Sequence, residues 1–335
     1  MSGGDARLDL LVVGAGPTGL ALGAAARAAG LTVLLVDRGG LVASLIDYPV
    51  DMTFFTTRER LEIADVPFAI PDEKPSRRQA IAYYQAVAAH HRLPLALHEE
   101  VVAIEPEPEG FRVRTTARGG DRTRAARAVA VATGYFAWPR RLGVPGEELP
   151  WVRRRYREPW DHFDQQVVIV GAGNSAAEAA LDLFRHGARV TLVHRGERVK
   201  ETVKYWLKPD LENRIEEGSI GALFGARVTA FSNAGVEVER DGQPFTLAAD
   251  AAYVLIGYRP ATGLLERAGV RVDAESAVPA FDPATGETGV PGLYVAGTAR
   301  AGRETQRIFI ENSREHGIEV VAHLAARLRA GLARA

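Results

Sequence analysis

The 335-residue sequence contains no cysteine. This absence excludes disulfides, thiolate metal sites and cysteine nucleophiles, so no thiol of the protein can carry electrons. A basic excess is also missing, because 41 Lys and Arg are balanced by 42 Asp and Glu and the formal net charge is −1. Nucleic-acid and membrane surfaces both require such an excess, so we expect neither as a partner.

Long uninterrupted apolar runs are absent as well. The uncharged stretch 10–26 resembles a signal peptide in length, but Gly14, Gly16, Pro17 and Gly19 interrupt it, and Asp5 and Asp9 precede it. It is better explained as a buried strand followed by a helix. A membrane span needs about 18 consecutive apolar residues, and the sequence offers none. We therefore expect a cytoplasmic protein.

An internal repeat organises the chain. Residues 8–40 align with residues 165–197 at a constant offset of 157 positions. Each copy has a short β-rich apolar run, a glycine-rich turn, an Ala-rich helix ending near Gly30 or Gly187, and a second β-rich run. Strand, turn, helix and strand in this order form the βαβ unit of a doubly wound sheet. The sequence thus predicts an α/β protein with two Rossmann-like dinucleotide-binding domains.

Outside the repeats the pattern is less regular. The further predicted elements are helices over residues 77–92 and 315–329 and strands over residues 101–104, 111–115, 236–239 and 245–247. Pro106 and Pro108 predict the loop between the first pair of strands.

The glycine-rich turn of the first copy has the spacing of a phosphate-binding loop. Gly14 permits a tight turn, Gly16 lets the backbone approach a pyrophosphate, and Gly19 lets the helix pack closely on the strand. The helix N-terminus then presents free N–H groups to the phosphates. Asp37 ends the second strand 23 residues after Gly14, where a carboxylate accepts hydrogen bonds from ribose hydroxyls. This copy predicts a site for an unphosphorylated adenosine ribose.

The second copy ends its second strand with the opposite charge. Its loop reads Gly171, Gly173 and Ala176, and alanine is an allowed variant in third place. Where the first copy has a carboxylate, this copy has His194 and Arg195, and two more basic residues follow within five positions. Such a cluster attracts a 2′-phosphate and predicts NADP(H). A merely solvated basic strand end is the alternative.

The two repeats and several further segments resemble a known family. With residues 128–136 and 292–299, the repeats resemble the thioredoxin-reductase-like flavoproteins. The segments that resemble the bacillithiol disulfide reductase family are residues 48–68, 74–85, 203–220 and 307–317. The resemblance covers nearly the whole chain. It implies an FAD-binding domain over residues 1–137 and 259–335, with an NADPH-binding domain over residues 138–258 inserted into it.

The resemblance also implies cofactor contacts, position by position. The expected FAD contacts are Gly14, Gly16, Pro17, Thr18, Gly19, Asp37, Ser44, Thr56, Val102, Thr133, Gly134, Gly297 and Thr305. The expected NADPH contacts are Gly171, Gly173, Asn174, Ser175, Ala176, His194, Arg195 and Lys200.

The chain departs from these families at three places. Thioredoxin reductases carry a Cys-x-x-Cys pair in the stretch that here spans residues 153–161, and that pair is missing. Many bacillithiol disulfide reductases have cysteine where Thr18 stands, and related reductases often have aspartate where Thr298 stands. Without cysteine, thioredoxin reductase activity through a protein dithiol is excluded.

The expected function is an FAD-dependent NADPH oxidoreductase. The flavin would pass electrons directly to an acceptor, most simply a low-molecular-weight disulfide such as bacillithiol disulfide, with His316 or Tyr48 as the group that protonates the leaving thiolate. One alternative is an NADPH–ferredoxin or flavodoxin reductase that docks its partner on the basic stretch 153–157. Another is a non-catalytic flavin redox sensor. The resemblance implies a homodimer or a dimer of dimers.

Overall fold

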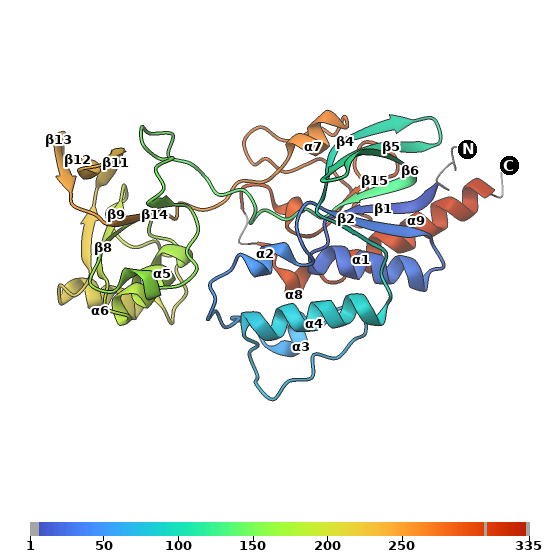
Figure 1. Ribbon diagram of the computed structural model, residues 1–335. Helices are drawn as coiled ribbons and strands as arrows, with labels where there is room; N and C mark the ends of the chain where they lie inside the picture. Colours follow the sequence, from blue (N-terminus) through green and yellow to red (C-terminus); the bar gives the residue numbers. More distant parts are fainter. Residues whose placement is uncertain (1–6, 305–306, 333–335) are drawn as a thin grey trace. The chain divides into compact units, whose positions relative to one another are not determined.

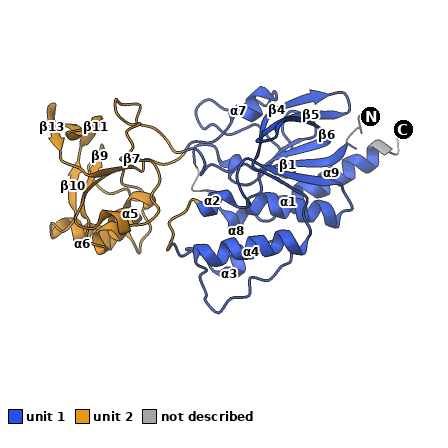
Figure 2. Ribbon diagram, in the orientation of Figure 1, with its two compact units in different colours: residues 1–46, 52–138, 259–335 blue, residues 47–51, 139–258 orange. Residues whose placement is uncertain are grey.

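Both glycine-rich repeats fold into a strand, a turn, a helix and a second strand in the computed structural model, which describes residues 7–304 and 307–332 (Figure 1). The chain forms two units. The first contains residues up to 46, residues 52–138 and residues from 259 on, and the second contains residues 47–51 and 139–258 (Figure 2). The predicted α/β class with one Rossmann-like domain inserted into another is confirmed.

The first unit is built on a seven-stranded sheet. Its strands are β1 (Leu8–Val13), β2 (Val33–Asp37), β3 (Leu95–Leu97), β4 (Glu99–Glu107), β5 (Gly110–Ala117), β6 (Gly120–Val131) and β15 (Leu293–Val295). Its helices are α1 (Pro17–Ala28), α2 (Ala43–Ile46), α3 (Arg58–Leu61), α4 (Arg77–His90), α7 (Gly263–Arg267), α8 (Ile310–Ser313), α9 (His316–Leu332) and the short 3-10 helix η2 (Gly297–Ala301).

Strand β6 joins two kinds of pairing in this sheet. Its first half pairs antiparallel with β5, while its second half pairs parallel with β1 and β15. The order β3-β2-β1-β6-β5-β4 leaves β4 at an edge. Helix α1 packs against β1 and β2, next to α4 and α9 (Figure 1).

One predicted loop boundary is wrong. Pro106 was expected in the loop after the first strand of the meander, but it lies inside β4 and opposes Phe111 of β5. A proline has no N–H to give to a neighbouring strand, and an edge strand has no neighbour on one side. The edge position of β4 therefore lets the strand continue through the proline to Glu107.

The second unit contains a five-stranded parallel sheet and a three-stranded antiparallel sheet. The parallel strands are β7 (Val152–Arg153), β8 (Gln166–Val170), β9 (Arg189–His194), β10 (Gly221–Phe224) and β14 (Ala251–Val254), in the order β10-β9-β8-β14-β7. The antiparallel strands are β11 (Ala226–Ser232), β12 (Gly235–Arg240) and β13 (Gln243–Leu247). The helices are α5 (Asn174–Arg185), α6 (Lys208–Glu216) and the 3-10 helix η1 (Trp160–His162).

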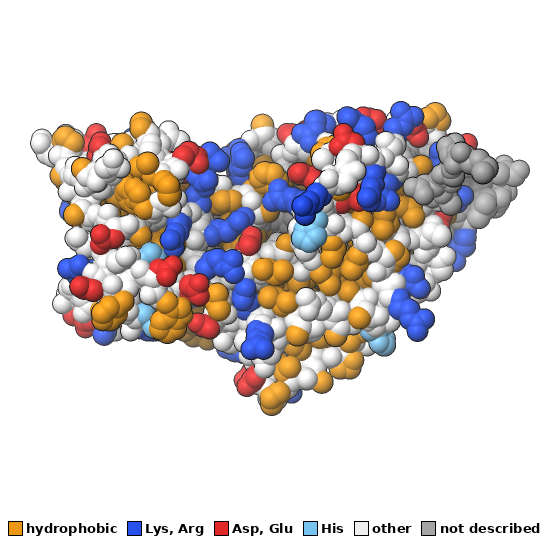
Figure 3. Space-filling model, viewed as in Figure 1, with side chains coloured by type: hydrophobic (Ala, Val, Ile, Leu, Met, Phe, Trp, Pro, Cys, Tyr) orange, Lys and Arg blue, Asp and Glu red, His pale blue; other side chains and the backbone are white. Residues whose placement is uncertain are grey.

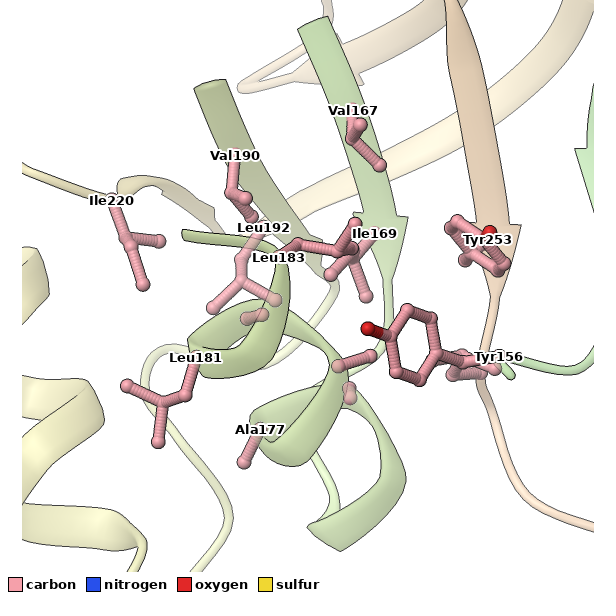
Figure 4. Packing of buried hydrophobic residues seen from close by; sticks show 14 of the residues in the cluster. Tyr156, Val167, Ile169, Ala177, Leu181, Leu183, Val190, Leu192, Ile220 and Tyr253 are labelled. Carbon is pink, nitrogen blue, oxygen red and sulfur yellow. The ribbon is translucent and has the colours of Figure 1, made fainter. Parts of the chain in front are cut away.

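Strand β8 shows how its continuous apolar run serves both faces of the parallel sheet. Val167 and Ile169 belong to the core that contains the residues of α5, whereas Val168 and Val170 belong to the core with the antiparallel strands. Successive side chains of a strand point to opposite faces, so both faces must be covered. Figure 4 shows the α5 side of this arrangement, where Tyr253 of β14 joins the cluster.

The surface carries charges of both signs. Side chains of Lys and Arg and of Asp and Glu are both visible on each unit (Figure 3), in keeping with the formal net charge of −1. Among the residues that the structure describes, no helix is both long and apolar enough to span a membrane.

Candidate functional site: two phosphate-binding loops

The first loop, between β1 and α1, depends on two glycines for its shape. Gly14 has a φ of +114°, and a Cβ there would lie 2.5 Å from the carbonyl oxygen of Ala132. A Cβ on Gly19 would lie 2.0 Å from the carbonyl oxygen of Gly14. Gly16 is different, since a Cβ there would have no atom within 4 Å. The loop is therefore closed behind Gly14 and Gly19 and open at Gly16, where the N-terminus of α1 begins.

Asp37 is held rigidly at the end of β2. One oxygen of its carboxylate accepts a hydrogen bond from the Ala15 amide at 2.7 Å, and the other accepts one from the Gly39 amide at 2.8 Å. Each carboxylate oxygen keeps a further lone pair for another donor. The partly exposed carboxylate can therefore receive ribose hydroxyls beside the loop while it braces the loop itself.

The second loop, between β8 and α5, repeats this geometry. Gly171 has a φ of +133°, and a Cβ there would lie 2.3 Å from the carbonyl oxygen of Leu255. Gly173 is open, with no atom within 4 Å of a would-be Cβ. Ala176 is fully buried against the loop, so the second copy has room for a methyl group that the first copy lacks at Gly19. Both predicted loops are thus built in the same way.

The structure reveals a second pair of matching segments that the sequence analysis missed. Each loop glycine packs against the end of the next strand of its sheet, at Ala132 after β6 and at Leu255 after β14. Two residues later come Gly134, with a φ of +66°, and Gly257, with a φ of +96°. A Gly-Tyr pair marks both segments in the sequence, but the two pairs are 123 positions apart, not 157 as in the repeat.

The hydroxyl of Thr133 has no hydrogen-bond partner among the described residues, and its oxygen is shielded from solvent. The expected contact between Thr133 and FAD stays a prediction. The neighbouring Gly134 leaves its backbone more accessible, because a Cβ there would approach only Thr298, at 3.5 Å.

Three residues expected or proposed at the flavin end, Gly297, Thr18 and His316, lie together with Ser313 in the first unit. Gly297 has a φ of +65° and donates its N–H to Nδ1 of His316 at 3.0 Å. A Cβ on Gly297 would lie 2.7 Å from the hydroxyl of Thr18. That hydroxyl is in turn 3.2 Å from the hydroxyl of Ser313. Residues almost 300 positions apart thus surround one end of the first loop.

His316 is buried in this cluster, and burial, with the nearby Arg300 guanidinium, lowers its pKa to about 4. The ring is therefore neutral at pH 7, and Nδ1 accepts the Gly297 N–H, so the proton sits on Nε2. A neutral imidazole is a very weak acid. This geometry argues against His316 as the group that protonates a leaving thiolate.

Tyr48 lies in the short segment 47–51, which belongs to the second unit. Asp47 forms an ion pair with Arg155 at 3.2 Å, and the Val50 amide donates to the carbonyl of Arg157 at 2.8 Å. The segment is therefore fastened at both of its ends. Tyr48 stays a predicted proton donor.

The basic cluster of the second copy surrounds the end of β9. Burial, followed by the charges of Lys200 and Arg195, lowers the pKa of His194 below its usual value. The Lys200 amide donates to the carbonyl of Ala172 at 3.2 Å, which brings this lysine beside the loop. The side chains of Arg195 and Lys200 are exposed. Like charges that lower the pKa of a histidine form a site that favours an anion.

Asn174, at the start of α5, holds the loop that follows β9. Its Oδ1 accepts a hydrogen bond from the Lys204 amide at 2.9 Å, and its Nδ2 donates to the carbonyl of Thr202 at 3.4 Å. Ser175 is exposed on the first turn of the same helix. The side chain of Asn174 therefore shapes the site, and its contact with NADPH stays a prediction.

The remaining expected FAD contacts lie on several elements of the first unit. Pro17 opens α1 and Ser44 lies in α2. The Thr56 hydroxyl donates to the Glu311 carboxylate at 2.5 Å, and the carbonyl of Val102 in β4 accepts from Arg267 at 3.4 Å. Thr305 lies outside the described residues.

Glu178 is a titratable group that the sequence analysis overlooked. Burial raises its pKa to about 7, so it is partly protonated at neutral pH. Glu178 lies on α5, the helix that follows the second phosphate loop. The signal is visible in the sequence, where Glu178 is the only charged residue between Asn174 and Leu181.

The basic stretch 153–157 is largely occupied by internal partners. Arg153 donates to the hydroxyl of Tyr253 at 3.3 Å, and Arg154 contacts Glu148 at 3.4 Å. Since Arg155 pairs with Asp47, three of the four arginines already have partners within the second unit. A free basic docking face for an acidic redox protein is not supported. The described residues also contain no cluster of His, Asp and Glu that could hold a metal ion.

Comparison with known proteins agrees with this architecture. Residues 11–297 match the family model described as pyridine nucleotide-disulphide oxidoreductase. Bacilliredoxin reductase Bdr of Bacillus subtilis is 36% identical over 319 residues, which cover 95% of this chain and 97% of that protein. The solved structure of bacillithiol disulfide reductase Bdr from Bacillus cereus is 35% identical, with a TM-score of 0.94 over 96% of this chain and 100% of that one.

A more distant structure shows the fold alone. The thioredoxin reductase of T. acidophilum is 20% identical with a TM-score of 0.76, over 96% of this chain and 99% of that one. Together with the two phosphate loops, these matches settle the family. The chain belongs to the pyridine nucleotide-disulphide oxidoreductases and, within them, to the bacillithiol disulfide reductase family.

Proposed function

We propose that the protein holds FAD on its first phosphate loop and NADPH on its second, and reduces a low-molecular-weight disulfide without any thiol of its own. The observation that carries this proposal is the contrast between two loops of the same shape. One ends in the carboxylate of Asp37, and the other ends in the basic pair His194 and Arg195. A carboxylate suits free ribose hydroxyls and repels a 2′-phosphate, whereas a basic pair attracts one.

The residues of the first loop fit a flavin dinucleotide. Gly16 leaves open space at the N-terminus of α1, where free N–H groups attract phosphates. Asp37, already fixed by Ala15 and Gly39, would accept the ribose hydroxyls of such a ligand. The chemistry that bound FAD supplies is the transfer of an electron pair from the reduced nicotinamide to an acceptor.

The chain's own residues then position the reactants. Gly297, Thr18 and Ser313 hold one end of the first loop by hydrogen bonds and close packing, and His316 fixes the Gly297 amide in a neutral, buried setting. With no cysteine in the chain, no thiol of the protein could relay electrons, and bound FAD would supply them to the disulfide. Its sulfur–sulfur bond breaks, and two thiols form after uptake of protons. Tyr48 is the proposed donor of one proton.

The second loop is tested by the choice between NADPH and NADH. A charge-assisted hydrogen bond to the 2′-phosphate contributes about 1.5–3 kcal/mol, so Arg195→Ala should raise the KM for NADPH about 10- to 100-fold. The KM for NADH should change less than about twofold. Arg240→Ala is the matched control, because this exposed arginine of β12 lies outside the basic cluster and pairs with Asp241 at 3.7 Å. Equal effects on both dinucleotides would contradict the assignment.

The acceptor is tested with the purified, flavin-loaded protein under anaerobic conditions. We expect bacillithiol disulfide to drive NADPH oxidation faster than glutathione disulfide or cystine, and ferredoxin to be inert. Fast turnover with ferredoxin and none with any disulfide would overturn the proposal and favour a ferredoxin reductase. Failure of NADPH to bleach the flavin absorbance would instead indicate a sensor.

We also propose that the protein forms a homo-oligomer, as its family resemblance implies. Light scattering coupled to gel filtration should give a dimer or a tetramer of the 36.1 kDa chain. A monomer at micromolar concentration would contradict this.

A further inference from the structure

Two large aromatic side chains stand exposed on the loop that follows β9. Tyr205 is 83% exposed and Trp206 is 41% exposed. Their rings meet edge to face, with centroids 4.8 Å apart and an angle of 87° between the planes. The ammonium group of Lys204 lies 5.8 Å from the centre of the Trp206 ring. An aromatic ring exposed to water does not gain the free energy that its burial would contribute to folding. Two adjacent exposed rings therefore suggest a binding role.

The loop that carries the pair is firmly anchored. Val199 and Val203 are 2% and 4% exposed and belong to the core of the second unit. Leu211 in α6 is fully buried in the same core. The apolar side chains of this stretch therefore face inward, and the two aromatic rings face outward from a fixed backbone.

The same loop is fastened to the second phosphate loop. The Lys200 amide donates to the carbonyl of Ala172 at 3.2 Å. The Lys204 amide donates to Oδ1 of Asn174 at 2.9 Å, and Nδ2 of Asn174 donates to the carbonyl of Thr202 at 3.4 Å. These bonds place the backbone just before Tyr205 in contact with the first residue of α5.

The position of the pair in the chain selects one part of the dinucleotide. The loop begins at His194 and Arg195 and passes Lys200, the residues assigned above to the 2′-phosphate of the adenosine ribose. The base attached to that ribose is adenine, and a base stacks well on aromatic faces next to a positive charge. We propose that Tyr205 and Trp206 form a stacking surface for the adenine base of the dinucleotide bound at the second phosphate loop, an inference that rests on the proposed NADPH site.

The test is the affinity of the flavin-loaded protein for NADP⁺ and for 2′,5′-ADP, measured by calorimetry. The second ligand has the adenine and the 2′-phosphate but no nicotinamide. Tyr205→Ala should weaken both ligands about tenfold, and Trp206→Leu should act in the same direction. Tyr205→Phe keeps the ring and should stay within about twofold of the wild type.

A matched control comes from the same unit. Phe163 is 77% exposed just before β8, at the opposite ends of the parallel strands from the phosphate loop. Phe163→Ala removes an equally exposed ring and should leave both affinities unchanged. Unchanged affinities in Tyr205→Ala and Trp206→Leu would overturn the inference. So would a loss for NADP⁺ without a loss for 2′,5′-ADP, because the pair would then contact the nicotinamide.

Arg195→Ala, measured in parallel, separates this inference from the one on which it rests. If Arg195→Ala weakens both ligands while Tyr205→Ala does not, only the stacking surface is wrong. If the wild type binds neither ligand, or Arg195→Ala has no effect, the NADPH site itself is wrong and the stacking surface falls with it.

Discussion

The two open glycines allow ligand binding to be separated from folding. Gly16 has a φ of −79° and a ψ of −179°, values that alanine adopts freely, and a Cβ there meets no atom within 4 Å. Gly16→Ala should therefore lower the free energy of unfolding of the apoprotein by less than about 1 kcal/mol, the usual effect at a helix N-cap. The added methyl group nevertheless lies at the mouth of the loop, where a pyrophosphate would approach.

The expected loss of flavin affinity follows from the contacts that the methyl group blocks. Two charge-assisted hydrogen bonds between loop amides and phosphate oxygens contribute about 1.5–3 kcal/mol each. Losing both weakens FAD binding by about 3–6 kcal/mol, or roughly 10²- to 10⁴-fold. The protein should be purified colourless, and titration of the apoprotein with FAD, followed by flavin fluorescence, should give the weakened dissociation constant.

Two further variants make this measurement decisive. Gly173 has a φ of −94° and is equally open, so Gly173→Ala should yield yellow protein that has lost NADP⁺ affinity. Gly19→Ala places a methyl group 2.0 Å from a backbone oxygen and should instead destabilise the first unit. Wild-type FAD affinity in Gly16→Ala would refute the assignment of the first loop. A colourless Gly173→Ala protein would show that the two loops are assigned in the wrong order.

Three more outcomes are expected. Thr133→Val removes a buried hydroxyl that has no partner among the described residues, so it should raise the free energy of unfolding by about 1 kcal/mol with FAD retained. Thr115→Val breaks the 2.6 Å hydrogen bond to Glu99 and should lower the free energy of unfolding. Urea denaturation of both variants measures these changes, and a Thr133→Val protein less stable than the wild type would contradict the first. His316 has a folded pKa of about 4, below its unfolded value of about 6.5, so the unfolded chain binds the proton first. The free energy of unfolding should therefore fall by up to about 3 kcal/mol as the pH drops from about 6.5 to about 4. The variant His316→Gln should flatten that slope, and an unchanged slope would refute this account of His316. A bound 2′-phosphate should raise the lowered pKa of His194, so the affinity for NADP⁺ should increase from pH 8 to pH 6.5 in the wild type but not in His194→Asn. Calorimetry measures both affinities, and equal pH dependence in the two proteins would exclude a contact between His194 and the 2′-phosphate.

Local patterns were sufficient to predict both phosphate loops. The glycine spacing and the change from a β-rich apolar run to an Ala-rich helical stretch are properties of short segments, and the constant offset of the repeat made each copy a check on the other. The strand-end residues Asp37 and His194 were found for the same reason, since they are a fixed distance from their loops. The helix predicted over residues 77–92 ends at His90 instead, because fraying of a helix end by one or two residues leaves no mark on the pattern.

Contacts between distant parts of the chain could not be predicted in this way. Thr18 meets Ser313 across 295 positions, and the burial that lowers the pKa of His316 exists only after α9 has packed beside α1. No pattern in the residues around His316 reports that burial, so it was considered as an acid. Pro106 was misplaced for a related reason, since only the order of the strands shows that β4 is an edge.

The segment 47–51 changes what counts as a separable part of this protein. Because these five residues leave the first unit to join the second, the polypeptide passes between the units four times, twice more than a simple insertion requires. A fragment cut at 139 and 258 would lose Asp47 and Val50, and with them the partners of Arg155 and of the Arg157 carbonyl. Residues 139–258 alone are therefore not a complete domain, and transferring them into another reductase would require including the segment 47–51 or replacing its contacts.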